Sequence, residues 1–538
     1  MNMSGHIAIV GTGPTGIYTF QRLIEHSDPL TISLFESGPQ VGIGMPYSSA
    51  ACRKSMLANI ASIEIPDLPQ SYLGWMTTLP KAVLRGFGVD PDTLDDRQFT
   101  PRLLLGQYFR AQFIELLREA EARGHVVHIH EETEIVDILP GDDGVRVADV
   151  AAERPEVFDR LILATGHVWP EEEETARSYY PSPWTGLFDA DIPPVRIGVM
   201  GTSLSSIDAA MAVAAQHGTF ARDTDGHLLF RLADESGDLK ITLMSRTGIL
   251  PEADFYCPIP YEPLRVMTDA ALEVASDAGE DGLLDRVFGL FVAEILAEDP
   301  AWAEGSGLAS ATADSIADAY FSDRLKRDPF RWAAFNLAEV ERNKIDRRVV
   351  RWRYAILRMH EKMEALLPNF STHDRERFDA GLKRVFIDNY AAVPSESIRR
   401  LLALRDAGVL NLCALGRDYD RDTNDLGTKI VANGETHVFD VFIDARGQRA
   451  MTSKDLPFPT LRDLLLDAGC DVPVIADDYS LIAPGIRLGR IAMGAIPYLM
   501  HDRPFVQGIT AAAEIGRAIG AVEVRPRYRR RPTVWMAA

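Results

Sequence analysis

Apolar and polar residues near the amino terminus follow a strand, helix, strand order. Residues 7–10 form an apolar run, residues 17–24 carry apolar side chains at helical spacing, and residues 30–35 form a second apolar run. Such runs predict a buried strand, a helix with one apolar face and a returning strand. A unit of this kind is typical of a doubly wound parallel sheet. The pattern therefore predicts a first Rossmann-like unit.

A second unit with the same order begins further along the chain. Residues 195–200 form an apolar run, residues 204–216 have helical spacing, and residues 240–245 form the returning strand. Residues 262–404 then carry helical periodicity, and strand character returns between residues 409 and 445. The predicted fold class is α/β, with two Rossmann-like units and a large helical insertion.

One eight-residue pattern occurs twice, at 159–166 and at 440–447. Each copy has an Asp, a buried strand and a turn that ends in Gly. We expect the two copies to mark the crossings between an outer domain and an inserted one, with the second copy returning the chain to the first sheet. The predicted domains are an outer domain of residues 1–190 and 440–538, an inner domain of residues 191–261 and 391–439, and a helical insertion of residues 262–390, a possible substrate lid.

Composition and charge narrow the classes of partner. The chain has 538 residues, and its 56 basic and 78 acidic side chains give a net charge of −22. Because an acidic surface repels phosphate backbones, nucleic acid is not an expected partner. No run approaches the length of a membrane span and the amino terminus lacks a basic leader, so a cytoplasmic location without membrane binding is expected. The four cysteines lie far apart in the sequence, which predicts neither a metal site nor a redox dithiol.

The turn after the first strand reads Gly-Thr-Gly-Pro-Thr-Gly. Its first glycine suits a tight turn, its second lets the backbone approach a pyrophosphate, and its third lets helix and strand pack closely. The helix that follows offers N–H groups to phosphates. Glu36 closes the second strand, where a carboxylate can accept hydrogen bonds from a ribose. The predicted dinucleotide-binding residues are Gly11, Gly13, Pro14, Thr15, Gly16 and Glu36.

The second unit carries a weaker form of this motif. Gly201 follows the strand, and Ser203 and Ser206 replace the second and third glycines. Small side chains still permit a close approach, and their hydroxyls could bond phosphate oxygens. Arg246 stands where the first unit has its acid, and an arginine can bind a 2′-phosphate that a carboxylate would repel. We therefore expect NADPH here in preference to NADH.

These residues resemble those of flavoproteins with two dinucleotide domains. The chain looks most similar to the FAD/NAD(P)-binding family of the FAD-dependent urate hydroxylase type, which is related to flavin-dependent N-hydroxylating monooxygenases. The resemblance covers most of the chain except residues 262–390. It rests on residues 11–16, 35–47, 57–62, 99–108, 164–167, 201–208 and 504–508.

The resemblance implies a role for each matching segment. The first glycine motif and Glu36 would hold the adenosine and pyrophosphate of FAD, while the second motif and Arg246 would hold NADPH. Further residues would lie near the flavin or its ribityl and phosphate groups, and these are Gly44, Tyr47, Asn59, Arg102, Gly166 and Gly494.

Three classes of function fit these residues. The first is a monooxygenase, in which NADPH reduces FAD and a flavin C4a-hydroperoxide passes one atom of molecular oxygen to a small-molecule substrate. Asn59 and His167 are its candidate catalytic residues. The second is a reductase that delivers electrons to a protein or quinone acceptor. The third is a redox sensor that binds FAD without catalysis. The sequence gives no indication of the substrate or of the oligomeric state.

Overall fold

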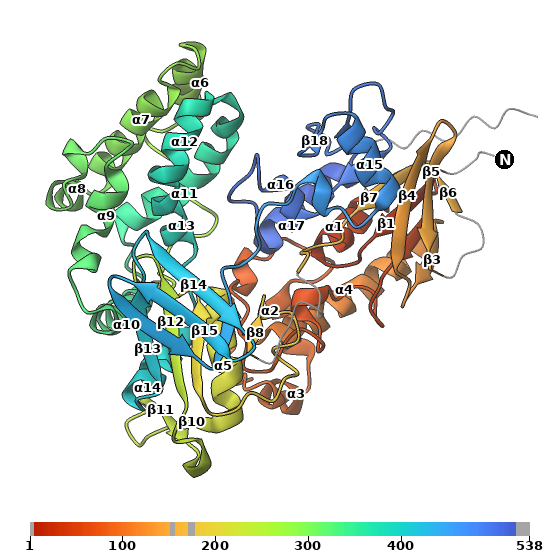
Figure 1. Ribbon diagram of the computed structural model, residues 1–538. Coiled ribbons are helices and arrows are strands. Elements are labelled where there is room, and N and C mark those ends of the chain that lie inside the picture. Colours follow the sequence, from red (N-terminus) through yellow and green to blue (C-terminus); the bar gives the residue numbers. More distant parts are fainter. Residues whose placement is uncertain (1–4, 151–155, 170–177, 523–538) are drawn as a thin grey trace, which may run out of the picture. The chain divides into compact units, whose positions relative to one another are not determined.

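The computed structural model describes residues 5–150, 156–169 and 178–522. The chain divides into two compact units (Figure 1). Unit 1 comprises residues 1–54, 60–168 and 448–538, and unit 2 comprises residues 55–59 and 169–447. Unit 1 is therefore built from both ends of the chain, as expected for a domain that contains an insertion.

Unit 1 is organised around a parallel sheet of five strands. Their order is β20-β7-β1-β2-β3, and every neighbouring pair is parallel. The strands are β1 (His6–Val10), β2 (Thr31–Phe35), β3 (Val126–His130), β7 (Arg160–Leu163) and β20 (Ile491–Met493). Strand β7 has four buried residues in succession, which is the pattern of a strand covered on both faces.

Helices and a smaller sheet complete unit 1. The antiparallel sheet of β4 (Ile135–Gly141), β5 (Gly144–Asp149) and β6 (Glu156–Phe158) connects β3 to β7. A short hairpin pairs β18 (Val474–Ile475) with β19 (Leu481–Ile482). The helices are α1 (Pro14–Leu23), α2 (Tyr72–Thr78), α3 (Lys81–Gly86), α4 (Arg102–Ala122), α15 (Pro459–Asp467), α16 (Ile496–Leu499) and α17 (Gly508–Gly520).

Unit 2 repeats this plan. Its parallel sheet has the order β13-β12-β9-β17-β8, and an antiparallel sheet connects β13 to β17 just as β4–β6 connect β3 to β7. The parallel strands are β8 (Tyr179–Tyr180), β9 (Arg196–Met200), β12 (Lys240–Ser245), β13 (Leu410–Ala414) and β17 (Val441–Asp444). The antiparallel strands are β14 (Tyr419–Asn424), β15 (Gly427–Ala432) and β16 (Glu435–Phe439), and a separate hairpin pairs β10 (Gly218–Arg222) with β11 (Leu228–Leu232).

The helices of unit 2 lie between β9 and β13 in the sequence. Helix α5 (Leu204–His217) follows β9, and a long helical segment, green to teal in Figure 1, follows β12. Its members are α6 (Asp269–Asp277), α7 (Leu283–Glu298), α8 (Pro300–Gly305), α9 (Ile316–Leu325), α10 (Pro329–Asp346), α11 (Arg351–Leu366), α12 (Thr372–Ala380), α13 (Leu382–Tyr390) and α14 (Ser395–Asp406). The predicted fold class, with two Rossmann-like units and a helical insertion, is confirmed.

The two Asp-strand-Gly repeats take equivalent places in the two units. The Asp159 carboxylate accepts the backbone N–H of His6 at 2.8 Å, and the Asp440 carboxylate accepts the backbone N–H of Arg196 at 3.2 Å. Each acid thus ties the start of one strand to the first residue of the strand beside it. The two copies of the repeat therefore occupy the same position in two units that share one strand arrangement.

The predicted domain boundaries at 190 and 440 are wrong. Strand β17 pairs with β9 and β8, so the second repeat belongs to the sheet of unit 2, and the chain returns to unit 1 only at Gln448. Strand β8 belongs to that sheet as well, which moves the first boundary to residue 168. Because buried strands of both sheets have the same apolar pattern, the sequence could not reveal which sheet β17 joins.

Helix α17 packs tightly against α1 through a glycine. A Cβ on Gly516 would stand 2.8 Å from both the Thr15 carbonyl oxygen and the Thr19 nitrogen, and backbone atoms of this kind cannot rotate away. Gly289, in the middle of α7, has open space at the same position. The two glycines therefore differ in packing alone, since both are helical.

We expect Gly516→Ala to lower the stability of unit 1 by about 1–3 kcal/mol, because α1 and α17 must separate to admit the methyl group. Gly289→Ala is expected to raise stability by about 0.5–1 kcal/mol, since alanine favours the helix and meets no neighbour. Thermal unfolding of both variants beside the parent protein measures the difference. Equal shifts of the unfolding temperature in the two variants would contradict the packing argument.

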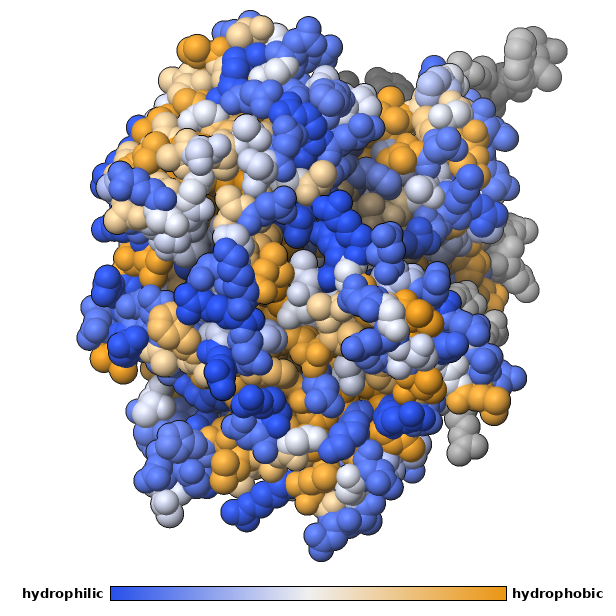
Figure 2. Space-filling model, turned by 60° about the vertical axis from the view of Figure 1, so that its left-hand side comes forward, coloured by the Kyte–Doolittle hydropathy of each residue, from blue (hydrophilic) through white to orange (hydrophobic). Residues whose placement is uncertain are grey.

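The surface is mixed in character. On the face drawn in Figure 2, hydrophilic residues are interspersed with small groups of hydrophobic ones. Within the part of the chain that the structure describes, no helix combines the length and apolar character needed to cross a membrane.

Candidate nucleotide-binding sites

A cavity of about 290 Å³ opens in unit 1 at the carboxyl ends of β1, β2 and β7. This edge of a parallel sheet is where doubly wound folds bind their ligands. The lining comes from residues 10–15, 35–37, 44–47, 133–135 and 164–167, with Pro457, Phe458, Ile496, Gly508, Ile509 and Ala512. The predicted residues Gly11, Gly13, Pro14, Thr15, Glu36, Gly44, Tyr47, Gly166 and His167 are all among them.

The turn after β1 brings backbone to the cavity wall. Gly11 has φ +94°, and a Cβ there would stand 2.3 Å from the Ala164 carbonyl oxygen, so only glycine fits. Gly13 has an ordinary extended conformation, with φ −72°, and no side chain caps the helix that it begins. The first N–H groups of α1 lack partners within the helix. N–H groups of this kind at a helix amino terminus are able to bind an anion.

Glu36 is fixed in place by backbone and hydroxyl donors. One carboxylate oxygen, Oε2, accepts the Thr12 N–H at 3.1 Å and the Thr12 hydroxyl at 2.5 Å, while Oε1 accepts the Gly38 N–H at 3.1 Å. The Thr12 hydroxyl in turn accepts the Gly42 N–H at 3.0 Å. A carboxylate has about four acceptor positions, two on each oxygen, so this network leaves one on Oε1. Glu36 is thus oriented and still able to accept a hydroxyl.

A loop from Gly44 to Tyr47 lies over the start of α1. A Cβ on Gly44 would stand 2.9 Å from the Pro14 Cδ and 3.0 Å from the Gly13 Cα, and Gly44 has φ +82°. The two glycine backbones therefore meet without side chains between them. Burial raises the pKa of Tyr47 to about 12, although the charge of Arg102 acts in the opposite direction. The Tyr47 phenol is therefore a neutral group at the cavity wall.

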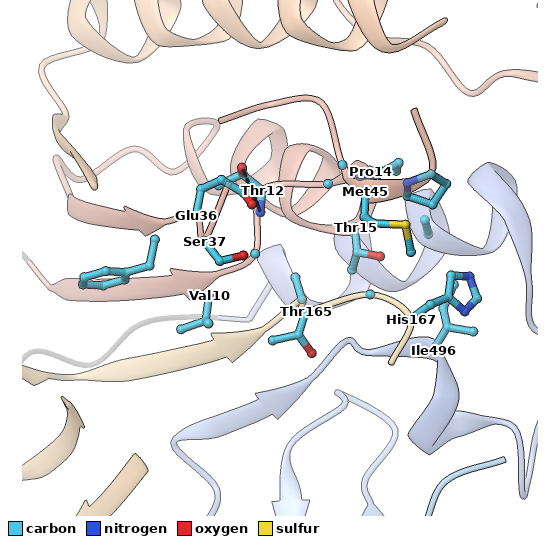
Figure 3. A pocket seen from close by; sticks show the side chains of 18 of the residues that line it. Val10, Thr12, Pro14, Thr15, Glu36, Ser37, Met45, Thr165, His167 and Ile496 are labelled. Carbon is cyan, nitrogen blue, oxygen red and sulfur yellow. Dashed lines mark hydrogen bonds between the residues drawn. The ribbon is translucent and has the colours of Figure 1, made fainter. Parts of the chain in front are cut away.

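His167 lies at the far end of the cavity from Glu36, beside Ile496 (Figure 3). Burial lowers its pKa below the ordinary value of 6.5, a hydrogen bond with Gln448 raises it, and the nearby charge of Arg102 lowers it. Gln448 also accepts the Val168 N–H at 3.1 Å. The imidazole is therefore neutral at pH 7, and Arg102 carries its charge near this end of the cavity rather than in its lining.

Three other predicted residues do not line the cavity. A Cβ on Gly16 would stand 2.3 Å from the Gly11 carbonyl oxygen, so Gly16 permits helix α1 to pack. A Cβ on Gly494 would lie 3.1 Å from both the Leu163 carbonyl oxygen and a Thr15 methyl group, which is again a packing position. Asn59 belongs to unit 2 and is exposed, and its predicted catalytic role remains a prediction.

Other lining residues were missed by sequence reasoning. Thr12 orients Glu36, yet it occupies a position that the glycine motif leaves free. The first turn of α17 lines the cavity through Gly508 and Ile509, and Gly508 has φ +77°. The match at residues 504–508 was the signal that could have indicated this helix start.

The second motif has a different structure in unit 2. Gly201 has φ +124°, and a Cβ there would stand 2.3 Å from the Ser206 Oγ. Ser206 is buried, and its hydroxyl donates to the Ala445 carbonyl oxygen at 3.4 Å. It fills the packing position of a third glycine, and its hydroxyl is directed to this carbonyl in the interior, which contradicts the predicted role as a phosphate ligand. Ser203 is exposed at the start of α5, where its side chain makes no capping bond, so it stays a candidate.

Arg246 follows β12 and is exposed. A cavity of about 270 Å³ begins at the next residue, Thr247, and is lined by Trp332 and by Leu412 and Ala414 of β13. Unit 2 thus also has an opening at the carboxyl edge of its parallel sheet.

Comparison with known proteins agrees with this architecture. Residues 8–168 match the family described as FAD-NAD(P)-binding, so unit 1 contains a flavin and nicotinamide nucleotide-binding fold. Residues 268–390 match the family described as the YdhS-like middle domain, which is the helical insertion. The chain is 52% identical over 525 residues to the Escherichia coli (strain K12) protein called "Uncharacterized protein YdhS", with 98% of each chain covered. The chain therefore belongs to the YdhS family.

Solved structures that match the chain include an ornithine N-hydroxylase and an L-lysine 6-monooxygenase. The ornithine N-hydroxylase of Kutzneria sp. 744 and the L-lysine 6-monooxygenase of Pseudomonas syringae are each 14% identical to this chain, with a TM-score of 0.48. Each comparison covers 96% of this chain and 98% of the other. At this level we transfer no activity from them. The relation to the urate hydroxylase type stays a prediction.

Proposed function

We propose that the chain is an FAD-dependent oxidoreductase that takes electrons from NADPH and oxygenates a small molecule. The cavity of unit 1 carries this proposal. It has uncapped helical N–H groups on one wall and an oriented carboxylate at one end. Those are the two features that a dinucleotide needs, one for its pyrophosphate and one for its adenosine ribose.

The residues present fit FAD. A Cβ on Gly13 would lie 3.3 Å from the Gly44 Cα, so the two bare backbones meet at the cavity wall and present no side chain to a pyrophosphate. Glu36 would accept a ribose hydroxyl on the free position of Oε1. When bound, FAD would accept a hydride from the nicotinamide nucleotide and supply the reduced flavin with which molecular oxygen reacts.

The opposite end of the cavity has groups suited to the reacting part of the flavin. The neutral His167 can donate or accept one hydrogen bond without a change of charge. Arg102 would stabilise negative charge that develops near it, as a fixed cation in a partly desolvated place does. The apolar side chains of Met45 and Ile496 would exclude water from this end.

The test begins with the purified full-length protein. We expect it to be yellow, to release FAD on denaturation, and to lose its visible flavin absorption when NADPH is added without oxygen. NADH should act more slowly at equal concentration. A colourless protein that does not take up added FAD would refute the proposal.

Admission of oxygen separates the three functions. A monooxygenase should return to oxidised flavin after a measurable delay, and a reductase should return at once but transfer electrons rapidly to an added quinone. A protein whose flavin NADPH cannot reduce would be a sensor. Stopped-flow absorbance records all three outcomes.

A further inference from the structure

Two arginines stand side by side at the carboxyl edge of the sheet in unit 2. Arg246 follows β12 and Arg417 follows the neighbouring strand β13, and both are exposed. The ladder continues past the strand ends, since the Gly416 N–H donates to the Arg246 carbonyl oxygen at 3.0 Å. Arg417 is the next residue. The backbone therefore fixes the two arginine positions next to each other.

A third arginine reaches this edge from the helical insertion. Arg384 on α13 stacks its guanidinium over the Phe321 ring, 5.3 Å from its centroid. Phe321 also contacts Arg324, whose guanidinium donates to the Leu250 carbonyl oxygen at 2.8 Å. Leu250 lies in the loop that follows Arg246. Side chains thus connect α13 to the loop after β12.

The charges of Arg246 and Arg417 lie near enough to Arg384 to act on it. Burial lowers the pKa of Arg384 first, and the charges of Arg246 and Arg417 lower it further, while Asp318 acts against them. None of the three guanidinium groups, which we call the arginine cluster, forms an ion pair with a carboxylate among the described residues. Arg377 on the preceding helix, by contrast, pairs with three aspartates.

Three neighbouring cations, none of which forms an ion pair with a carboxylate among the described residues, require an explanation in a chain of net charge −22. Like charges at close range destabilise the fold, and acidic side chains are abundant enough to neutralise them. An anionic ligand would remove the repulsion and gain charge-assisted hydrogen bonds from each guanidinium. The position beyond the second strand of a Rossmann-like unit is where the adenosine ribose of a nicotinamide nucleotide lies.

We propose that Arg246, Arg384 and Arg417 together bind the 2′-phosphate of NADPH, so that the helical insertion supplies part of the cofactor specificity. This inference rests on the proposed use of NADPH. It assigns the insertion a role in nucleotide selection through Arg384, in addition to any role as a lid. The phosphate dianion neutralises the cluster, whereas the plain ribose of NADH leaves it unpaired.

Calorimetric titration of the full-length protein tests the proposal without any turnover. The probes are 2′,5′-ADP, which carries the 2′-phosphate, 5′-ADP, which lacks it, and inorganic phosphate. We expect the parent protein to bind 2′,5′-ADP at least about 10-fold more tightly than 5′-ADP. Arg384→Ala and Arg417→Ala should each lower the affinity for 2′,5′-ADP by about 10-fold and leave the affinity for 5′-ADP almost unchanged.

Matched variants keep the test decisive. Arg405→Ala, which removes an exposed arginine beside Asp406 in the same unit, should change neither affinity. Arg384→Lys retains the charge and should lose less of the affinity for 2′,5′-ADP than Arg384→Ala does. The lysine variant replaces the alanine variant if the alanine protein does not fold. The proposal is overturned if Arg384 variants leave the ratio of the two affinities unchanged, or if inorganic phosphate binds as tightly as 2′,5′-ADP. If the purified protein contains no FAD but still prefers 2′,5′-ADP to 5′-ADP by the expected ratio, the proposed flavoenzyme function is refuted and the role of the arginine cluster is not.

Discussion

Replacing Gly13 with valine is expected to give a folded, colourless protein whose affinity for FAD is lower by about 1000-fold or more. Gly13 has φ −72° and an extended ψ, a conformation that valine adopts without strain, so the backbone turn should survive. The space is what valine removes. A Cβ at residue 13 would stand 3.3 Å from the Gly44 Cα, and valine adds two methyl groups at the wall of the cavity where the pyrophosphate is proposed to bind.

Equilibrium titration of the apo-protein with FAD, followed by flavin fluorescence, measures this loss. Gly13→Ala, with one carbon in the same direction, should show an intermediate loss. Gly86→Ala in α3 meets no neighbour within 4 Å and should retain the full affinity. A Gly13→Val protein that is purified yellow and binds FAD as the parent does would show that the pyrophosphate does not pass this turn.

Gly11 has a different role from Gly13, which makes it unsuitable for the same test. Its φ of +94° and the short distance to a backbone oxygen mean that any side chain there disturbs the sheet itself. Loss of flavin in a Gly11 variant would therefore report unfolding as readily as lost contact. The sequence motif gives both glycines the same weight, while the structure separates a glycine needed for conformation from one needed for space.

Much of the architecture could be predicted from the sequence because it depends on local pattern. The apolar runs at β1, β2 and β9, the glycine turn and the distance to Glu36 all involve residues close together in the chain. Their physical requirements leave few alternatives. The YdhS-like middle domain was likewise recognised as helical from its periodicity.

The remaining features depend on contacts between distant residues. Strand β17 joins the second sheet through pairing with β9, more than 200 residues away in the sequence, and its apolar residues suit either sheet. The Ser206 hydroxyl is occupied by its hydrogen bond to the Ala445 carbonyl oxygen. Arg384, on α13, lies near enough to Arg246 and Arg417, which follow two strands of the sheet, for their charges to lower its pKa. No local pattern carries this information.

Thr12 illustrates the same limit within the first motif. Its position is unrestricted in the Gly-x-Gly pattern, but its hydroxyl links Glu36 to the Gly42 N–H. The threonine is 2% exposed, so these bonds form away from water. The orientation of the carboxylate is therefore set by a residue whose importance appears only in three dimensions.

Removal of the Glu36 carboxylate should weaken FAD binding by about 100-fold in Glu36→Leu and by about 10-fold in Glu36→Gln. Leucine offers no acceptor to the ribose or to Thr12, whereas glutamine keeps one oxygen but cannot serve donors at both ends. Because the carboxylate would contact only the adenosine half, ADP should lose affinity by the same factor as FAD, while FMN should be unaffected. Glu115→Leu, which removes an exposed carboxylate of α4 outside the cavity lining, serves as the control and should change none of the three. Equal losses for FMN and ADP would mean that Glu36 supports the whole cavity and does not select the ribose, since only a local contact can distinguish the two halves of the dinucleotide.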